Sequence, residues 1–200
     1  MSRQDACNLP RRFSAFEYHL TAMTKRGHML AIIRFAVPED AQHLPAIERS
    51  AAQAFRTIAE LSGLADAPPM SVEQHSQFIA LSTCWVALDG DNRLQGFLSA
   101  RRHGSDLHLY ELSVMQAMQG RGFGRRLIEA AKDYARSNGL RFVTLTTFKN
   151  VPWNAPFYAR AGFLVQVTTG LDPRLATIVS EEYKHGFAPG SRCAMVWPVS

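Results

Sequence analysis

A glycine-rich segment, Gln119–Gly124, lies between an expected strand that ends at Val114 and an expected helix over residues 124–137. Alternate glycines let a backbone approach a ligand closely and present successive N–H groups to it. These donors would lie at the positive end of the helix dipole, which attracts anions. The segment therefore predicts a phosphate or pyrophosphate site, and three arginines add cationic donors beside it: Arg121, Arg125 and Arg126.

Two common classes of glycine loop do not fit this spacing. A Walker A loop ends in Gly-Lys followed by Ser or Thr, whereas Gly124 is followed by two arginines, which leaves no hydroxyl for Mg²⁺. A dinucleotide-binding loop needs G-x-G-x-x-G and an acidic residue after the next strand. Here the spacing is G-x-G-x-G, and the expected strand 142–147 ends in two threonines. The remaining pattern, Q/R-x-x-G-x-G/A after a strand, is satisfied by Gln119, Gly122 and Gly124.

A second motif lies at Val151–Phe163, where a short expected helix carrying Tyr158 ends in Gly-Phe. With this motif and the glycine segment, residues 31–199 resemble the GNAT N-acetyltransferase superfamily. The resemblance implies that family's acyl-CoA N-acyltransferase fold, with acetyl-CoA as co-substrate. It also implies that the chain is an N-acetyltransferase, in which a primary amine attacks the acetyl group directly in a ternary complex. A non-catalytic acyl-CoA-binding sensor or regulatory module would carry the same motifs and is the alternative.

The resemblance assigns a role to each matching position. Backbone groups of residues 112–114 would pair with the pantetheine arm, and N–H groups of residues 120–125 would hold the pyrophosphate. Arg121 or Arg125 is expected to reach the adenosine phosphate, and Asn154 the pantetheine. The residues expected to bind the cofactor are Leu112, Ser113, Val114, Gln119, Gly120, Arg121, Gly122, Phe123, Gly124, Arg125, Asn154 and Tyr158.

Acetyl transfer requires an amine that has lost its proton and a leaving thiolate that is stabilised or protonated. The resemblance places the Tyr158 hydroxyl near the thioester sulfur, as the general acid. Glu111 is the candidate base, directly or through water. His108 is a second candidate, and a reaction without a side-chain base is the third possibility. Because His108 and Glu111 are three residues apart on one expected strand, we expect them to face opposite sides of the sheet.

Hydrophobic periodicity and turn residues predict the elements that hold these residues. The first half reads as a strand, two helices and an antiparallel meander, and the second half alternates helices and strands. This order predicts an α/β fold with a mixed, mostly antiparallel central sheet of about six or seven strands, flanked by helices on both faces. The expected strands are 32–37, 85–88, 94–100, 107–114, 142–147, 163–168 and 193–199, and the expected helices are 40–58, 71–79, 124–137, 153–161 and 173–183.

Composition bounds the class of protein. Of the 200 residues, 46% are hydrophobic and 20% are charged, which suits one globular domain. We expect an N-terminal extension at 1–30, partly flexible, and an N-acetyltransferase domain at 31–200. No apolar run approaches the roughly 20 residues of a membrane span, and charged residues interrupt the N-terminal region where a secretion signal would need an apolar core. Three scattered cysteines favour a reducing compartment, which predicts a cytoplasmic protein.

The partners are less closely defined by the sequence. The acceptor is expected to be a small-molecule amine or a peptide amine. The net charge of +5 favours an acidic or zwitterionic amine, whereas scattered glutamates could line a pocket for a cationic one: Glu48, Glu60, Glu73, Glu111, Glu181 and Glu182. The arginine pairs are scattered without stacking aromatics, so we expect no nucleic acid partner. We also expect no membrane partner and, without ligand-spaced His, Cys or Asp, no metal. The apolar segment 193–199 suggests a homodimer.

Overall fold

The computed structural model describes residues 31–166 and 172–200. The expected extension at 1–30 and the last two residues of the expected strand 163–168 lie outside the described residues. The division into an extension and a domain stays a prediction.

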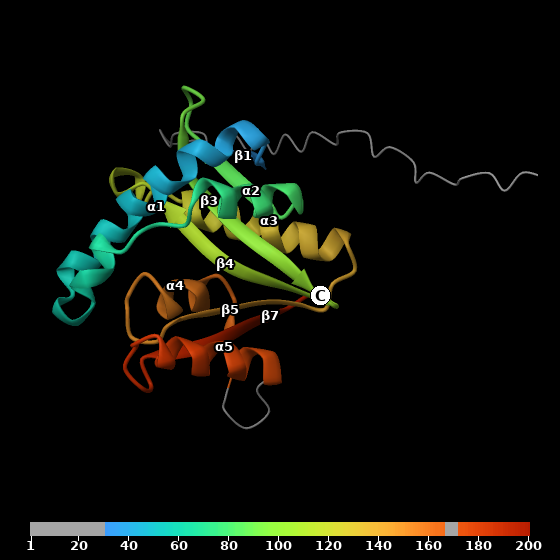
Figure 1. Ribbon diagram of the computed structural model, residues 1–200. Coiled ribbons are helices and arrows are strands. Elements are labelled where there is room, and N and C mark those ends of the chain that lie inside the picture. Colours follow the sequence, from blue (N-terminus) through green and yellow to red (C-terminus); the bar gives the residue numbers. More distant parts are fainter. Residues whose placement is uncertain (1–30, 167–171) are drawn as a thin grey trace, which may run out of the picture.

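A single mixed sheet forms the centre of the described structure (Figure 1). It has seven strands in the order β1-β2-β3-β4-β5-β7-β6. Every neighbouring pair is antiparallel except β4 and β5, which run parallel. The predicted fold class is therefore confirmed. The strands are β1 (Ile32–Phe35), β2 (Cys84–Leu88), β3 (Leu94–His103), β4 (Asp106–Val114), β5 (Phe142–Phe148), β6 (Leu164–Val165) and β7 (Arg192–Pro198).

Helices cover both faces of this sheet (Figure 1). The α-helices are α1 (Leu44–Ala52), α2 (Val72–Ala80), α3 (Phe123–Ser137), α4 (Ala155–Arg160) and α5 (Pro173–Lys184). The 3-10 helices are η1 (Pro38–His43), η2 (Gln53–Thr57), η3 (Ala59–Asp66) and η4 (Gln116–Met118).

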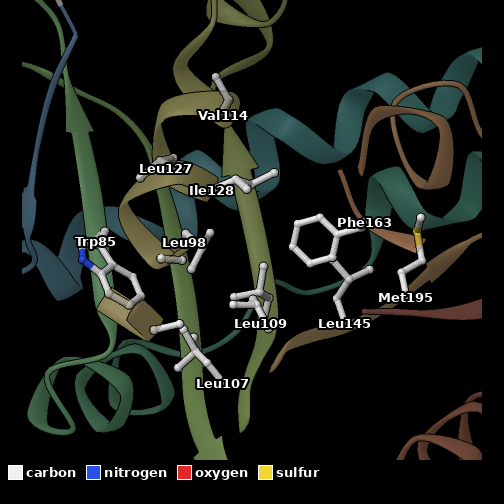
Figure 2. Close-up of a cluster of buried hydrophobic side chains, with 14 of the residues drawn as sticks. Trp85, Leu98, Leu107, Leu109, Val114, Leu127, Ile128, Leu145, Phe163 and Met195 are labelled. Atoms are coloured by element: carbon white, nitrogen blue, oxygen red, sulfur yellow. The ribbon is translucent and has the colours of Figure 1, made fainter. Parts of the chain in front are cut away.

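Two hydrophobic clusters show which helices cover which face. On one face, Leu127 and Ile128 of α3 pack against leucines of the strands, with Phe163 following α4 in the same cluster (Figure 2). On the other face, α1 and α2 bury Leu44 and Phe78 against β2 and β3. Because side chains alternate along a strand, Thr146 of β5 points away from the α3 face, and its hydroxyl donates a hydrogen bond to Glu182 of α5. Helix α5 therefore lies on the same face as α1 and α2.

A β-bulge in β4 changes which side chains share a face. Ser99 of β3 pairs with Glu111, but the next residue, Ala100, pairs with Leu109, so Tyr110 is the extra residue. One extra residue reverses the alternation of side chains beyond it. His108 and Glu111 therefore lie on the same face of the sheet, and the expectation that they face opposite sides was wrong.

The predicted helix over 40–58 is divided in the structure. Residues 38–43 wind as a 3-10 helix, α1 spans only Leu44–Ala52, and 3-10 turns follow it. Pro45 explains the start of α1, because proline lacks a backbone N–H and fits only the first turn of a helix. Residues 59–66, which lie outside every expected helix and strand, form the 3-10 helix η3.

Candidate active site

The parallel strands β4 and β5 separate along their length and open a cleft. They pair only from Asp106 to Leu109 on β4 and from Phe142 to Leu145 on β5. Beyond these pairs both strands continue and diverge, with α4 near the opening (Figure 1). A cavity of about 740 Å³ is lined by Tyr110–Val114 of β4 and by residues 146–148 of β5. In the described part of the chain, β4 has no strand partner on this side beyond Leu109, so its backbone is open to an extended ligand arm.

The glycine segment closes one end of the cleft. The side-chain amide of Gln119 donates to the carbonyl of Val114 over 3.1 Å and holds the loop to the end of β4. Gly120 and Gly122 have φ of 75° and 90°, which favours glycine, and no heavy atom lies within 4 Å of the position a Cβ would take at either residue. Among the described residues, none accepts a hydrogen bond from the backbone N–H groups of residues 120–125. These donors and the open space above the glycines fit a pyrophosphate.

The other residues of this segment have separate roles. A Cβ at Gly124 would lie 3.4 Å from the Phe157 ring, so this glycine allows α3 to approach α4. Phe123 is a buried core residue, which leaves only its backbone for a ligand. Of the arginines, Arg125 lines the cavity. Arg121 is exposed and outside the lining, and Arg126 donates to the carbonyl of Ala31.

Glu111 lies half-buried in the wall of the cleft. Burial and the nearby carboxylate of Glu48 raise the pKa of Glu111 from 4.5 to about 7. The Ser113 hydroxyl donates to its Oε1 over 2.7 Å, and Arg192 opposes the rise in pKa more weakly. A carboxyl group with a pKa near 7 can accept a proton at neutral pH and release it again.

His108 shares the face of Glu111 but does not line the cavity. It is 2% exposed, and its Nδ1 lies 2.9 Å from Oγ1 of Thr144. Burial, with a smaller contribution from Arg174, lowers the pKa of His108 to about 3. A neutral imidazole that is held away from the cleft is a poor candidate for the base.

Tyr158 and Asn154 lie on the opposite side of the cleft, at α4. The Tyr158 ring packs between Phe157 and Phe163, with centroid distances of 5.3 and 5.7 Å. Burial and then the charge of Glu111 raise the pKa of the Tyr158 phenol, which keeps its proton in place. Asn154 lines the cavity, and its side chain makes no capping hydrogen bond.

The structure also brings together cavity residues that the sequence motifs did not assign. They come from α1, η2, β5, β7 and the loop before α4, and they are Glu48, Phe55, Phe148, Trp153 and Arg192. Of the six candidate glutamates, only Glu48 and Glu111 line the cavity. The helical spacing of Glu48, Ala51, Ala52 and Phe55 was the available signal, but it does not show which face of a helix meets a cleft.

Among the residues that the structure describes, no group of three or more His, Cys, Asp and Glu side chains is arranged to hold a metal ion. None of the helices within 31–166 and 172–200 is long and apolar enough to cross a membrane.

Comparison with known proteins identifies the family. The model of the acetyltransferase (GNAT) family matches residues 44–163, and the chain therefore belongs to this family. Mouse (Mus musculus) N-alpha-acetyltransferase 80 is 34% identical over 80 residues, which are 40% of this chain and 26% of that protein. The chain thus matches about a quarter of the length of this curated relative.

Solved structures of low sequence identity share the fold. The PaiA N-acetyltransferase of Thermoplasma acidophilum, in complex with coenzyme A, has a TM-score of 0.62 at 18% identity, covering 85% of this chain and 99% of that one. Rv2747 of Mycobacterium tuberculosis, in complex with CoA and a second ligand, has a TM-score of 0.63 at 18% identity. That alignment covers 84% of this chain and 99% of the other.

Proposed function

We propose that the chain transfers the acetyl group of acetyl-CoA to a primary amine by direct attack in a ternary complex. The observation that carries this proposal is the cleft between β4 and β5. It joins an open strand edge and free backbone N–H groups to a carboxyl group whose pKa is about 7. The strand edge is complementary to the pantetheine arm of a thioester cofactor, and the N–H groups are complementary to its pyrophosphate.

In this proposal, the backbone edge of residues 112–114 binds the pantetheine arm, and the N–H groups of residues 120–125 bind the pyrophosphate. Arg125 adds a positive charge from the cavity wall. Asn154, whose side chain is not used as a helix cap, is available to hydrogen-bond the arm. When bound, acetyl-CoA supplies the thioester carbonyl that the amine attacks.

Glu111 handles the proton of the acceptor. The acceptor amine arrives as an ammonium ion, and Glu111 takes one proton from it, directly or through a water molecule. The neutral nitrogen then attacks the acetyl carbonyl and forms the new C–N bond as the C–S bond breaks. The second proton that the nitrogen loses passes to the departing thiolate, directly or through water, so that the products are the amide and the CoA thiol. Tyr158 keeps its proton and donates a hydrogen bond to the departing sulfur, which stabilises the developing thiolate.

Thermal melting with acetyl-CoA tests the binding half of the proposal, with NAD and ATP as controls. A ligand at about 100 times its Kd adds about 2.7 kcal/mol, which raises the melting temperature of a domain of this size by several degrees. Thiol release in the presence of an amine panel tests the catalytic half. Glu111→Gln is expected to keep the acetyl-CoA shift and lose thiol release. Absence of both signals in the unmodified chain contradicts the proposal, whereas a shift without thiol release supports a binding module.

A further inference from the structure

One face of α1 and η2 forms a wall of the cavity. Glu48, Ala51, Ala52 and Phe55 recur at helical spacing and all line it. The two alanines leave space between the carboxylate of Glu48 and the ring of Phe55. This wall lies on the same face of the sheet as Glu111, because α1 packs on that face.

The carboxylate of Glu48 is held in place by Met70 and His75. Both of its oxygens accept from the backbone N–H of Met70, over 3.2 and 3.3 Å. Nε2 of His75, a completely buried side chain, lies 3.4 Å from Oε2 of Glu48. With its side chain 19% exposed, Glu48 presents a fixed negative charge to the cavity.

Aromatic side chains line the same cavity as this carboxylate. Phe55 meets Phe148 and Trp153 edge to face, with ring centroids 5.7 and 5.8 Å apart. All three residues line the cavity. Aromatic faces beside a carboxylate favour a cation, because the ring quadrupole attracts positive charge.

Three arginines line the cavity, Arg125, Arg160 and Arg192, and among the described residues none of them forms an ion pair with Glu48 or Glu111. Arg160 is the last residue of α4. Arg192 is already paired with Glu182, through hydrogen bonds of 2.6 and 2.9 Å, and its guanidinium lies 4.4 Å from the centroid of Phe148. Arg125 belongs to the first turn of α3, at the glycine segment. The region around Glu48 and Glu111 therefore holds two carboxylates that no arginine of the cavity pairs with directly. The two carboxylates are close enough for Glu48 to raise the pKa of Glu111.

We propose that the acceptor is a small amine with a second positive charge, whose reacting nitrogen meets Glu111 while its second cation lies against Glu48 and the aromatic wall. This inference rests on the proposed function and names its substrate class. A monoamine would neutralise only one of the two carboxylates, and an amine with a carboxylate tail would add a repulsion. The basic net charge of the whole chain, which favoured an acidic or zwitterionic acceptor, does not extend to this wall.

Matched substrates test the inference with the unmodified chain. Thiol release is measured with 1,5-diaminopentane, n-pentylamine and 5-aminopentanoic acid, which share a five-carbon chain and differ in the charge at the far end. We expect kcat/KM for the diamine to exceed that of the monoamine about tenfold, since one additional charge contact in a half-buried site is of that order. The amino acid is expected to be the poorest acceptor. Equal values for the diamine and monoamine, or a preference for the amino acid, would overturn the inference.

Glu48→Gln tests whether Glu48 binds the second positive charge of the acceptor. Glutamine keeps an oxygen for the Met70 N–H, so the fold is expected to remain, and melting in the absence of ligand checks this. The variant should bring the diamine-to-monoamine ratio close to one, whereas Glu60→Gln, an exposed carboxylate outside the cavity, should leave it unchanged. A ratio unchanged by Glu48→Gln would also overturn the inference.

A binding measurement separates failure of the inference from failure of the proposed function. Diamine and monoamine are titrated calorimetrically into the full chain with CoA bound. Preferential diamine binding that Glu48→Gln removes, without acetylation of any amine, supports the cation site and contradicts the enzymatic function. Acetylation of both amines without preference in rate or binding supports the function and overturns the inference.

Discussion

Glu111 is predicted to destabilise the fold at the pH where it would serve as a base. Its folded-state pKa of about 7 lies above the ordinary 4.5, so between these values the folded chain binds more protons than the unfolded chain. Stability contributed by this group therefore falls as pH rises from about 4.5 through 7 and is constant above that. A separation of roughly 2.5 pH units corresponds to about 3 kcal/mol. Glu111→Gln removes this titration and can still accept from Ser113.

The assay is thermal unfolding of both proteins at pH 4 and pH 8.5, with Glu60→Gln as the control for loss of an exposed charge. At pH 8.5 Glu111→Gln should melt roughly 6 to 12 °C above the unmodified chain, and at pH 4 the two should nearly coincide. The same variant should lose thiol release. A melting difference that does not change with pH would refute the reasoning, because it would show that Glu111 is not held in an environment that disfavours its charge.

Two further substitutions test other parts of the cleft, and a third tests the close approach of β3 to β4. Tyr158→Phe removes only the hydroxyl and should lower kcat by about ten- to a hundredfold with an unchanged acetyl-CoA melting shift; a normal kcat would exclude a role at the sulfur. Gly122→Ala forces a side chain into a backbone with φ of 90° and should cost about 1–2 kcal/mol of unfolding free energy while weakening the acetyl-CoA shift; an unchanged melting curve would contradict this. Gly96→Ala places a Cβ 2.8 Å from the carbonyl oxygen of Ser113, so denaturant unfolding should show a loss of about 1–3 kcal/mol, and full stability would show that β3 and β4 can separate there.

Local patterns predicted most of the fold. The capping box at Ser71 and Gln74 forms as its residue types indicate, and α3 ends at Ser137, just before Asn138 and Gly139. Turns between β2, β3 and β4 fall where glycine and aspartate are found, because these residues adopt turn conformations readily. Strand ends were predicted less well, since β3 continues to His103 and β6 spans only Leu164–Val165. The structure of residues 53–66 was harder to predict from the sequence. The 3-10 turns found there have no distinctive hydrophobic period and depend on packing against the rest of the chain.

The residues of the candidate site that the sequence predicted lie in the two continuous motifs and on the strand before the glycine segment, where Glu111 was named as the base. The spacing of Gln119, Gly122 and Gly124 was enough to predict an anion-binding loop, and that role stays a prediction. Glu48 belongs to a helix far away in the sequence, and its approach to Glu111 depends on how α1 packs across the sheet. The bulge at Tyr110 could not be predicted either, because a single inserted residue leaves no compositional signal. It nevertheless decides which side chains of β4 face the cleft.

The coupling between Glu48 and Glu111 leads to a last prediction, on the pH dependence of catalysis. The groups that act on Glu111 come from four elements: Glu48 of α1 raises its pKa, Ser113 and Leu112 of β4 lower it by hydrogen bonds, Arg192 of β7 lowers it by charge, and the neutral Tyr158 of α4 adds no charge. If Glu111 is the base, kcat/KM rises with pH as it loses its proton.

Glu48→Gln removes the charge that raises this pKa and should therefore move the rise in kcat/KM toward lower pH. The measurement is the pH profile of thiol release with n-pentylamine, an acceptor without a second charge, so that the shift reports on the base alone. Glu60→Gln should keep the original profile. An unmoved profile in Glu48→Gln would mean that the titrating group is not Glu111, since Glu48 is the charged group that raises the pKa of Glu111.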